Sequence, residues 1–249
     1  MNQKKKEYYL QMLRKETVPA MGCTEPAAAA LCAAGASAQL PGRPERLVLE
    51  ASGYILKNAM NVGIPGTDEM GLETACAMGA AVAAPEKSLL VLEGMSQEQK
   101  SFAKCLVEQG RVAVLKAETN EKVFLKVTAF CGEHTGQAVI SDKHGEFSCI
   151  VRDSKTVFDR RKENVDRPAL VRETYTCSVQ EIWDFAVSVG SQELAFLDEA
   201  INLNSAIARE GLQREYGLQV GKSVWKGVEI GILGGDLSNR AVAVAAAAA

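Results

Sequence analysis

The sequence is poor in the residues from which most metal and nucleophile sites are built. It has only two histidines, His134 and His144, and none of its seven cysteines pairs with another in the Cys-x-x-Cys spacing typical of zinc sites. Because the cysteines are odd in number and widely spaced, we expect no disulfide framework. Most of them are expected to be small buried residues in a reducing compartment.

The sequence also has no large excess of positive or negative charge and no long apolar run. The formal net charge is −3, and no extended cluster of lysine and arginine argues for a nucleic-acid partner. No segment reaches the roughly 20 apolar residues of a membrane span, and the first ten residues lack the apolar core of a secretory signal. These absences predict a cytoplasmic globular protein with neither a nucleic-acid nor a membrane partner.

Hydrophobic periodicity predicts an α+β fold. Between residues 111 and 151 the period changes to two, which is typical of an antiparallel sheet of three or four strands, and residues 46–51 alternate in the same way. The other periodic segments have helical spacing. They are 4–15, 26–39, 71–84, 97–109, 179–187, 192–215 and the chain from 224 onward.

Two domains are expected from this order. Residues 1–170 would form an α+β domain in which helices flank a small antiparallel sheet, and residues 171–249 would begin an all-helical domain. The alanine-rich run 241–249 has no glycine or charge to end a helix. We therefore expect the helical domain to be truncated.

Cys23 lies where a thiol becomes chemically useful. The segment Met-Gly-Cys-Thr-Glu-Pro precedes an alanine-rich run, which places Cys23 at the beginning of a helix. The unpaired N–H groups and the positive end of the helix dipole favour a thiolate there, so we predict a lowered pKa. Thr24 would cap the helix and Pro26 would occupy its first turn. Glu25 would recognise an amine, or would only compensate the dipole, and a buried structural role for Cys23 is the alternative.

The segment 57–67 offers a second group of candidates. Lys57, Asn58, Thr67 and the neighbouring backbone N–H groups would form a cradle for a small carboxylate. The Gly-Ile-Pro-Gly-Thr stretch lacks the Gly-Lys-Ser/Thr ending of a phosphate loop, and a tight turn between two helices is its other interpretation. His134 and Thr135, in a turn between glycines, are further candidates. His144 is expected in an exposed hairpin with no assigned role.

Four segments, taken in order, resemble the bacterial and archaeal L-cysteine desulfidase family, which is also described as an uncharacterised family related to the alpha chain of iron–sulfur L-serine dehydratase. They are 18–26, 52–60, 62–67 and 134–135, and 232–240 extends the resemblance.

The resemblance implies a cytoplasmic enzyme that uses an oxygen-sensitive [4Fe-4S] cluster to eliminate sulfide from L-cysteine, with pyruvate, ammonia and hydrogen sulfide as products. Cys23 would be the general base or, alternatively, a cluster ligand. From residue chemistry, and not from the resemblance, we expect Thr24 and Glu25 to contact the substrate. On the same grounds, Lys57, Asn58 and Thr67 would hold its carboxylate, and His134 and Thr135 would lie near the same pocket. The remaining cluster cysteines are implied mainly in a C-terminal helical half beyond residue 249, so this chain alone is expected to be inactive.

Two other functions stay open. An iron–sulfur L-serine dehydratase would use the same chemistry to expel hydroxide instead of sulfide. A non-catalytic module would bind a small ligand in the glycine-proline loop, with Cys23 as a redox-sensitive thiol. Pyridoxal phosphate chemistry is not expected, because no lysine lies in a convincing Schiff-base context. A homo-oligomer is compatible with all of these functions.

Overall fold

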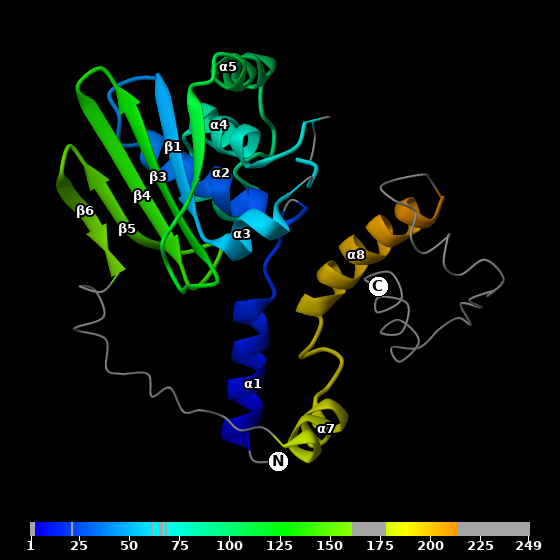
Figure 1. Ribbon diagram of the computed structural model, residues 1–249. Helices are drawn as coiled ribbons and strands as arrows, with labels where there is room; N and C mark the ends of the chain where they lie inside the picture. Colours follow the sequence, from blue (N-terminus) through cyan, green and yellow to red (C-terminus); the bar gives the residue numbers. More distant parts are fainter. Residues whose placement is uncertain are drawn as a thin grey trace. The chain divides into compact units, whose positions relative to one another are not determined.

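The computed structural model describes residues 3–20, 22–60, 62–64, 67, 69–160 and 178–213 (Figure 1). These residues form two compact units, of which one comprises 3–18 with 178–213 and the other comprises 19–160. None of the helices described in these ranges has the length and apolar character needed to cross a membrane.

The larger unit contains one sheet of six strands in the order β2-β1-β3-β4-β5-β6. The strands are β1 (Arg46–Ala51), β2 (Val112–Lys116), β3 (Phe124–Cys131), β4 (His134–Ser141), β5 (Phe147–Arg152) and β6 (Lys155–Asp159). The helices of this unit are α2 (Thr24–Ser37), α3 (Gly53–Asn58), α4 (Leu72–Val82), the 3-10 helix η1 (Pro85–Leu90) and α5 (Gln97–Glu108).

The sheet is larger than the sequence predicted, and it is mixed. Strand β1 lies between β2, to which it runs parallel, and β3, to which it runs antiparallel; the remaining pairs are antiparallel. Two parallel neighbours need a long crossover between them, and the chain from α3 to α5 provides it. The α+β class is therefore confirmed, whereas the expectation of a small, purely antiparallel sheet is wrong.

Helix α2 crosses the sheet and is buried along nearly its whole length (Figure 1). Its alanines allow very close approach of neighbouring elements. A Cβ atom on Gly79 of α4 would lie 1.9 Å from the Ala30 carbonyl oxygen, and one on Gly136 of β4 would lie 2.0 Å from that of Ala36. Small residues are thus required where α2 meets α4 and β4.

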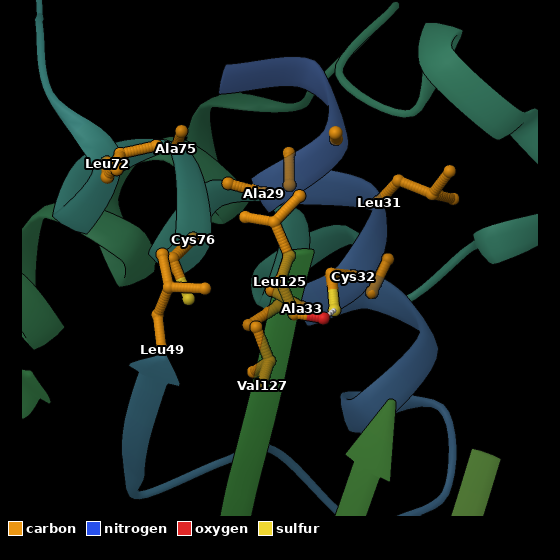
Figure 2. Close-up of a cluster of buried hydrophobic side chains, with 14 of the residues drawn as sticks. Ala29, Leu31, Cys32, Ala33, Leu49, Leu72, Ala75, Cys76, Leu125 and Val127 are labelled. Carbon is orange, nitrogen blue, oxygen red and sulfur yellow. Dashed lines mark hydrogen bonds between the residues drawn. The ribbon is translucent and has the colours of Figure 1, made fainter. Parts of the chain in front are cut away.

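Two of the cysteines belong to the core that α2, α4 and the sheet enclose. Figure 2 shows Cys32 and Cys76 among apolar side chains that include Leu49 and Leu125. Both cysteines are fully buried, and burial raises the pKa of Cys32 to about 12. The expectation that such thiols are structural is therefore confirmed for these two.

The smaller unit consists of α1 (Gln3–Glu16), α7 (Val179–Ser188) and α8 (Phe196–Gln213). Tyr9 packs edge-on against Phe185 with ring centroids 5.4 Å apart, and Lys6 Nζ lies 2.6 Å from Glu193 Oε2. The N-terminal helix thus groups with helices from the other end of the chain, which differs from the expected boundary at residue 170. The helix expected from 224 onward lies outside the described residues.

Candidate functional site

Cys23 occupies the position that the sequence predicted, at the beginning of α2. It is the N-cap residue, with an extended backbone, and its carbonyl oxygen accepts a hydrogen bond from Ala27 N at 3.4 Å. Thr24 is already the first helical residue, and its hydroxyl donates to Glu25 Oε2 at 3.3 Å instead of accepting from a backbone N–H group. The prediction that Thr24 caps the helix is therefore wrong.

The Glu25 carboxylate is the centre of a hydrogen-bonded group. Its Oε2 accepts a hydrogen bond from Cys23 Sγ at 2.8 Å, and its Oε1 accepts one from Asn58 Nδ2 at 3.1 Å. Glu25 is 8% exposed, whereas Cys23 and Asn58 are half-buried. A buried carboxylate is costly unless donors surround it, and these donors satisfy that requirement.

Helix α3 holds Asn58 in place. The Ser52 hydroxyl caps this helix by accepting from Ile55 N at 3.3 Å, and it donates to the Lys122 carbonyl oxygen at 2.6 Å. Ile55 is fully buried in the core. Because α3 is anchored at both its cap and its apolar face, the Asn58 amide is fixed beside Glu25.

The thiol of Cys23 is not an activated thiolate. Burial raises its pKa, and the hydrogen bond to Glu25 and the negative charge of Glu25 raise it further, against smaller contributions from nearby backbone N–H groups. The predicted lowering of this pKa is therefore wrong. Burial of the thiol is the largest cause, and the Glu25 carboxylate two residues later adds to it against the effect of the helix terminus.

Glu25, in contrast, is held as a carboxylate. Burial by itself would raise its pKa, but the hydrogen bonds from Cys23 and Asn58 stabilise the charged form and leave the pKa below its ordinary value. A carboxylate has about four lone-pair positions, and three donors from the described residues contact this one. The arrangement therefore leaves capacity for one more donor, such as an ammonium group.

The structure corrects the expectation for His144, which is half-buried and not exposed. It makes only a minor electrostatic contribution to the lowered pKa of Glu25, after the hydrogen bonds from Cys23 and Asn58. The hairpin loop between β4 and β5 carries it to the same end of the sheet as the beginning of α2 (Figure 1). Its position in a short polar hairpin favoured an exposed residue, and no pattern in the sequence indicates the packing of that loop.

The structure does not bring Lys57 and Thr67 into this group. Lys57 is exposed in the last turn of α3. The Thr67 hydroxyl donates to the Ile64 carbonyl oxygen at 2.9 Å and accepts from Glu69 N at 3.2 Å, so it stabilises a turn. Thr67 also lines a cavity of about 510 Å³ between α4 and α5, and Cys23, Glu25 and Asn58 are not among its lining residues.

His134 and Thr135 lie at the opposite end of α2 from Cys23. They begin β4, next to Gly136, which contacts Ala36 in the last turn of the helix. At about 1.5 Å per residue, Ala36 is about 18 Å from the first helical residue. The expectation that they share a pocket with Cys23 is therefore wrong. Both bind Asp153 instead, through His134 Nδ1 at 3.0 Å and Thr135 N at 2.9 Å.

The described residues do not fit a [4Fe-4S] cluster by themselves. They contain no group of three histidine, cysteine or carboxylate side chains that could hold a metal ion. Cys32 and Cys76 are enclosed in the core, and Cys177 lies outside the described residues. Cys23 could serve as one cluster ligand only if other parts of the protein supplied the rest.

Comparisons with known proteins give relatives at moderate identity. The chain is 39% identical over 240 residues to a UPF0597 protein of Oleidesulfovibrio alaskensis, an alignment that covers 96% of this chain and 56% of that protein. It is 35% identical over 233 residues to UPF0597 proteins of Dichelobacter nodosus and Vibrio campbellii, covering 94% and 93% of this chain and 54% and 55% of theirs. No protein-family model and no solved structure matches the chain. The chain is thus a homologue of the UPF0597 proteins and spans about half the length of the relatives it matches.

Proposed function

We propose that this chain forms the amino-acid-binding part of an L-cysteine desulfidase. The reaction would consume L-cysteine and water and would release pyruvate, ammonia and hydrogen sulfide. The observation that carries the proposal is the hydrogen-bonded group of Cys23, Glu25 and Asn58 at the beginning of α2. The resemblance of the segments 18–26 and 52–67 to the desulfidase family supports it, because these segments supply the three residues.

The chemistry of the group suits an α-amino acid. A charged, buried carboxylate with a remaining lone pair pairs well with an ammonium group. An ammonium group at Glu25 would also neutralise the charge that raises the pKa of Cys23. Cys23 would then release its proton to water more readily, and the resulting thiolate could act as the base that removes the α-proton. Ligand binding, and not the helix terminus alone, would activate the sulfur.

A [4Fe-4S] cluster belongs to the proposal as a cofactor of the whole protein. Its open iron would act as a Lewis acid on the leaving sulfur. Because the described residues do not hold a cluster by themselves, none of the steps assigned to Cys23, Glu25 and Asn58 passes through it. The alternative role of Cys23 as one of several cluster ligands stays a proposal as well.

The experiment compares this 249-residue chain with a full-length UPF0597 protein, such as that of Oleidesulfovibrio alaskensis. Both are purified and incubated without oxygen with L-cysteine or L-serine, and sulfide and pyruvate are measured. We expect sulfide and pyruvate from L-cysteine with the full-length protein and no turnover by the 249-residue chain. Pyruvate from L-serine without sulfide from L-cysteine would establish the serine dehydratase alternative instead. If neither amino acid is consumed by either protein, the non-catalytic binding module is favoured.

A further inference from the structure

Helix α7 has an apolar face that the described residues leave uncovered. Its members Val179, Ile182, Trp183 and Val187 are 84%, 56%, 64% and 64% exposed, and no residue of this fully described helix is buried. Their spacing of three and four residues places the four side chains on one side of the helix. Single exposed apolar residues are ordinary, but a contiguous group that includes a tryptophan marks an interaction site.

The opposite side of α7 is firmly attached to the rest of its unit. Phe185 packs edge-on against Tyr9 of α1, and Glu181 forms an ion pair with Lys5 of the same helix. The Ser178 hydroxyl caps α7 by accepting from Glu181 N at 3.2 Å, and the Glu181 carboxylate accepts from Ser178 N at 3.0 Å. Because the cap and these contacts hold the helix, its apolar face is a defined surface.

Helix α8 of the same unit repeats the pattern. Leu203 and Ile207 are one turn apart and are 50% and 71% exposed. In the larger unit, by contrast, exposed apolar residues such as Tyr54, Leu115 and Val157 come from different elements. The described part of the chain therefore concentrates its exposed apolar surface on the helices α7 and α8.

The polar positions of α7 argue against a membrane surface as the partner. Helices that lie on a membrane surface carry lysine and arginine beside their apolar face. The polar residues of α7 are instead Gln180, Glu181, Asp184 and Ser188, without a basic side chain. The apolar face of α7 therefore suits the apolar surface of another folded segment of protein.

The relatives indicate which segment this is. The alignment with the UPF0597 protein of Oleidesulfovibrio alaskensis covers 96% of this chain and includes α7, but it covers only 56% of that protein. The corresponding shares for the relatives of Dichelobacter nodosus and Vibrio campbellii are 54% and 55%. Nearly half of each relative therefore has no counterpart in this chain, which is enough for a further domain.

We propose that the apolar face of α7 is an interdomain surface, which packs against the part of a full-length UPF0597 protein that this chain does not match. Burial of this face would remove the exposed tryptophan and its apolar neighbours from water. The inference does not depend on the ligand or the reaction assigned to Cys23, Glu25 and Asn58.

Photo-cross-linking in the full-length protein of Oleidesulfovibrio alaskensis tests the occupant directly. The photoreactive residue p-benzoylphenylalanine replaces the residue aligned with Trp183, and cross-linked peptides are identified by mass spectrometry after irradiation. We expect cross-links within one polypeptide, from this position to the part outside the alignment. The position aligned with Ser188, on the opposite side of α7, is the matched control and should lose most of this cross-link.

Three results of that experiment would overturn the inference. Cross-links to the matched part of the same polypeptide would show that the rest of this chain covers the face. A product of twice the mass would identify a second copy as the occupant. A protein that forms no cross-link from this position would show that the face stays in contact with water.

Tryptophan fluorescence of the 249-residue chain provides the complementary measurement. The chain has two tryptophans, Trp183 and Trp225, so that Trp225→Phe leaves Trp183 as the only indole, and Trp183→Phe gives the signal of the other for comparison. We expect Trp183 to emit at long wavelength, to be quenched readily by iodide, and to belong to a monomer in sedimentation. Emission at short wavelength with weak quenching would contradict the inference, because the face would already be covered without the unmatched part.

Discussion

At the beginning of α2, Cys23 and Glu25 form a hydrogen-bonded group with Asn58 of α3. At the other end of the helix, Ala36 packs closely against the backbone of β4. At the first end, hydrogen bonds stabilise the charged Glu25 carboxylate. At the second end, the packing leaves no room for an additional methyl group. One end of α2 therefore carries the reactive polar groups, and the other end is tightly packed against the sheet. Substitutions at the two ends should differ in kind, with altered reactivity at one and altered stability at the other.

The largest effect is expected at the packed end. Gly136→Ala places a methyl group about 2 Å from the Ala36 carbonyl oxygen, and the resulting overpacking should lower the free energy of unfolding by about 3 kcal/mol. Denaturant titration measures the change. Gly53→Ala is the matched control, because its new methyl group would be 3.8 Å from a flexible lysine side chain. Equal stability of the two variants would show that α2 can move away from the sheet.

Asn58→Ala should produce the next largest effect, at the polar end. Loss of the hydrogen bond to a buried carboxylate should lower the free energy of unfolding by about 2 kcal/mol at neutral pH. The pKa of Glu25 is lowered in the folded protein, so its charge contributes stability above its ordinary pKa, and this contribution is lost as the pH falls through the folded pKa. The deficit of Asn58→Ala should therefore shrink in acid. Gln137→Ala, which removes a neutral hydrogen bond to Thr128, should show a pH-independent loss.

Glu25→Gln should change reactivity more than stability. Removal of the negative charge lowers the pKa of Cys23, so the thiolate fraction at pH 8 rises and alkylation of Cys23 accelerates several-fold. The rate can be followed by mass spectrometry of the Cys23 peptide, with the exposed Cys105 in the same molecule as the internal control. A Cys23 rate that is unchanged or slower would show that burial alone sets this pKa.

The smallest effect is expected for His134→Gln. The exposed contact between His134 and Asp153 is of a kind that contributes little, so stability should change by no more than about 0.5 kcal/mol. The alkylation rate of Cys23 should also stay the same, because His134 lies at the packed end of α2. A measurable change in that rate would show that the packed end of α2 also influences the reactivity of Cys23.

The sequence allowed the local features of the site to be predicted, but not its electrostatics. Pro26 and the alanine-rich run after Cys23 correctly indicated a helix start, although Thr24 does not cap the helix, and residues 46–51 and 111–151 correctly indicated strands. The pKa of Cys23 is raised first by burial and then by the hydrogen bond to Glu25, and periodicity carries no information on either. The half-buried position of His144 was missed for a similar reason, since the neighbours of this hairpin loop are fixed by tertiary packing against η1.

The local sequence patterns also could not predict which distant helices and strands pack or pair with each other. Residues 3–16 have a helical pattern that gives no indication of their partners, and Tyr9 packs against Phe185 from the far end of the chain. Strand β2 has the alternation of an antiparallel strand, yet it pairs in parallel with β1 because the intervening helices reverse the direction of the chain. Partner choice in both cases depends on contacts between residues distant in sequence.

The hydrogen bond from Cys23 to Glu25 has a consequence for the durability of the protein. Peroxide attacks the thiolate form of cysteine, and oxidation beyond sulfenic acid is essentially irreversible. A sulfur that stays protonated beside an anion is therefore shielded from oxidative damage until a cation offsets that anion. In the proposed binding of an amino acid, the Glu25 carboxylate would thus influence both the protection of this sulfur and its reactivity.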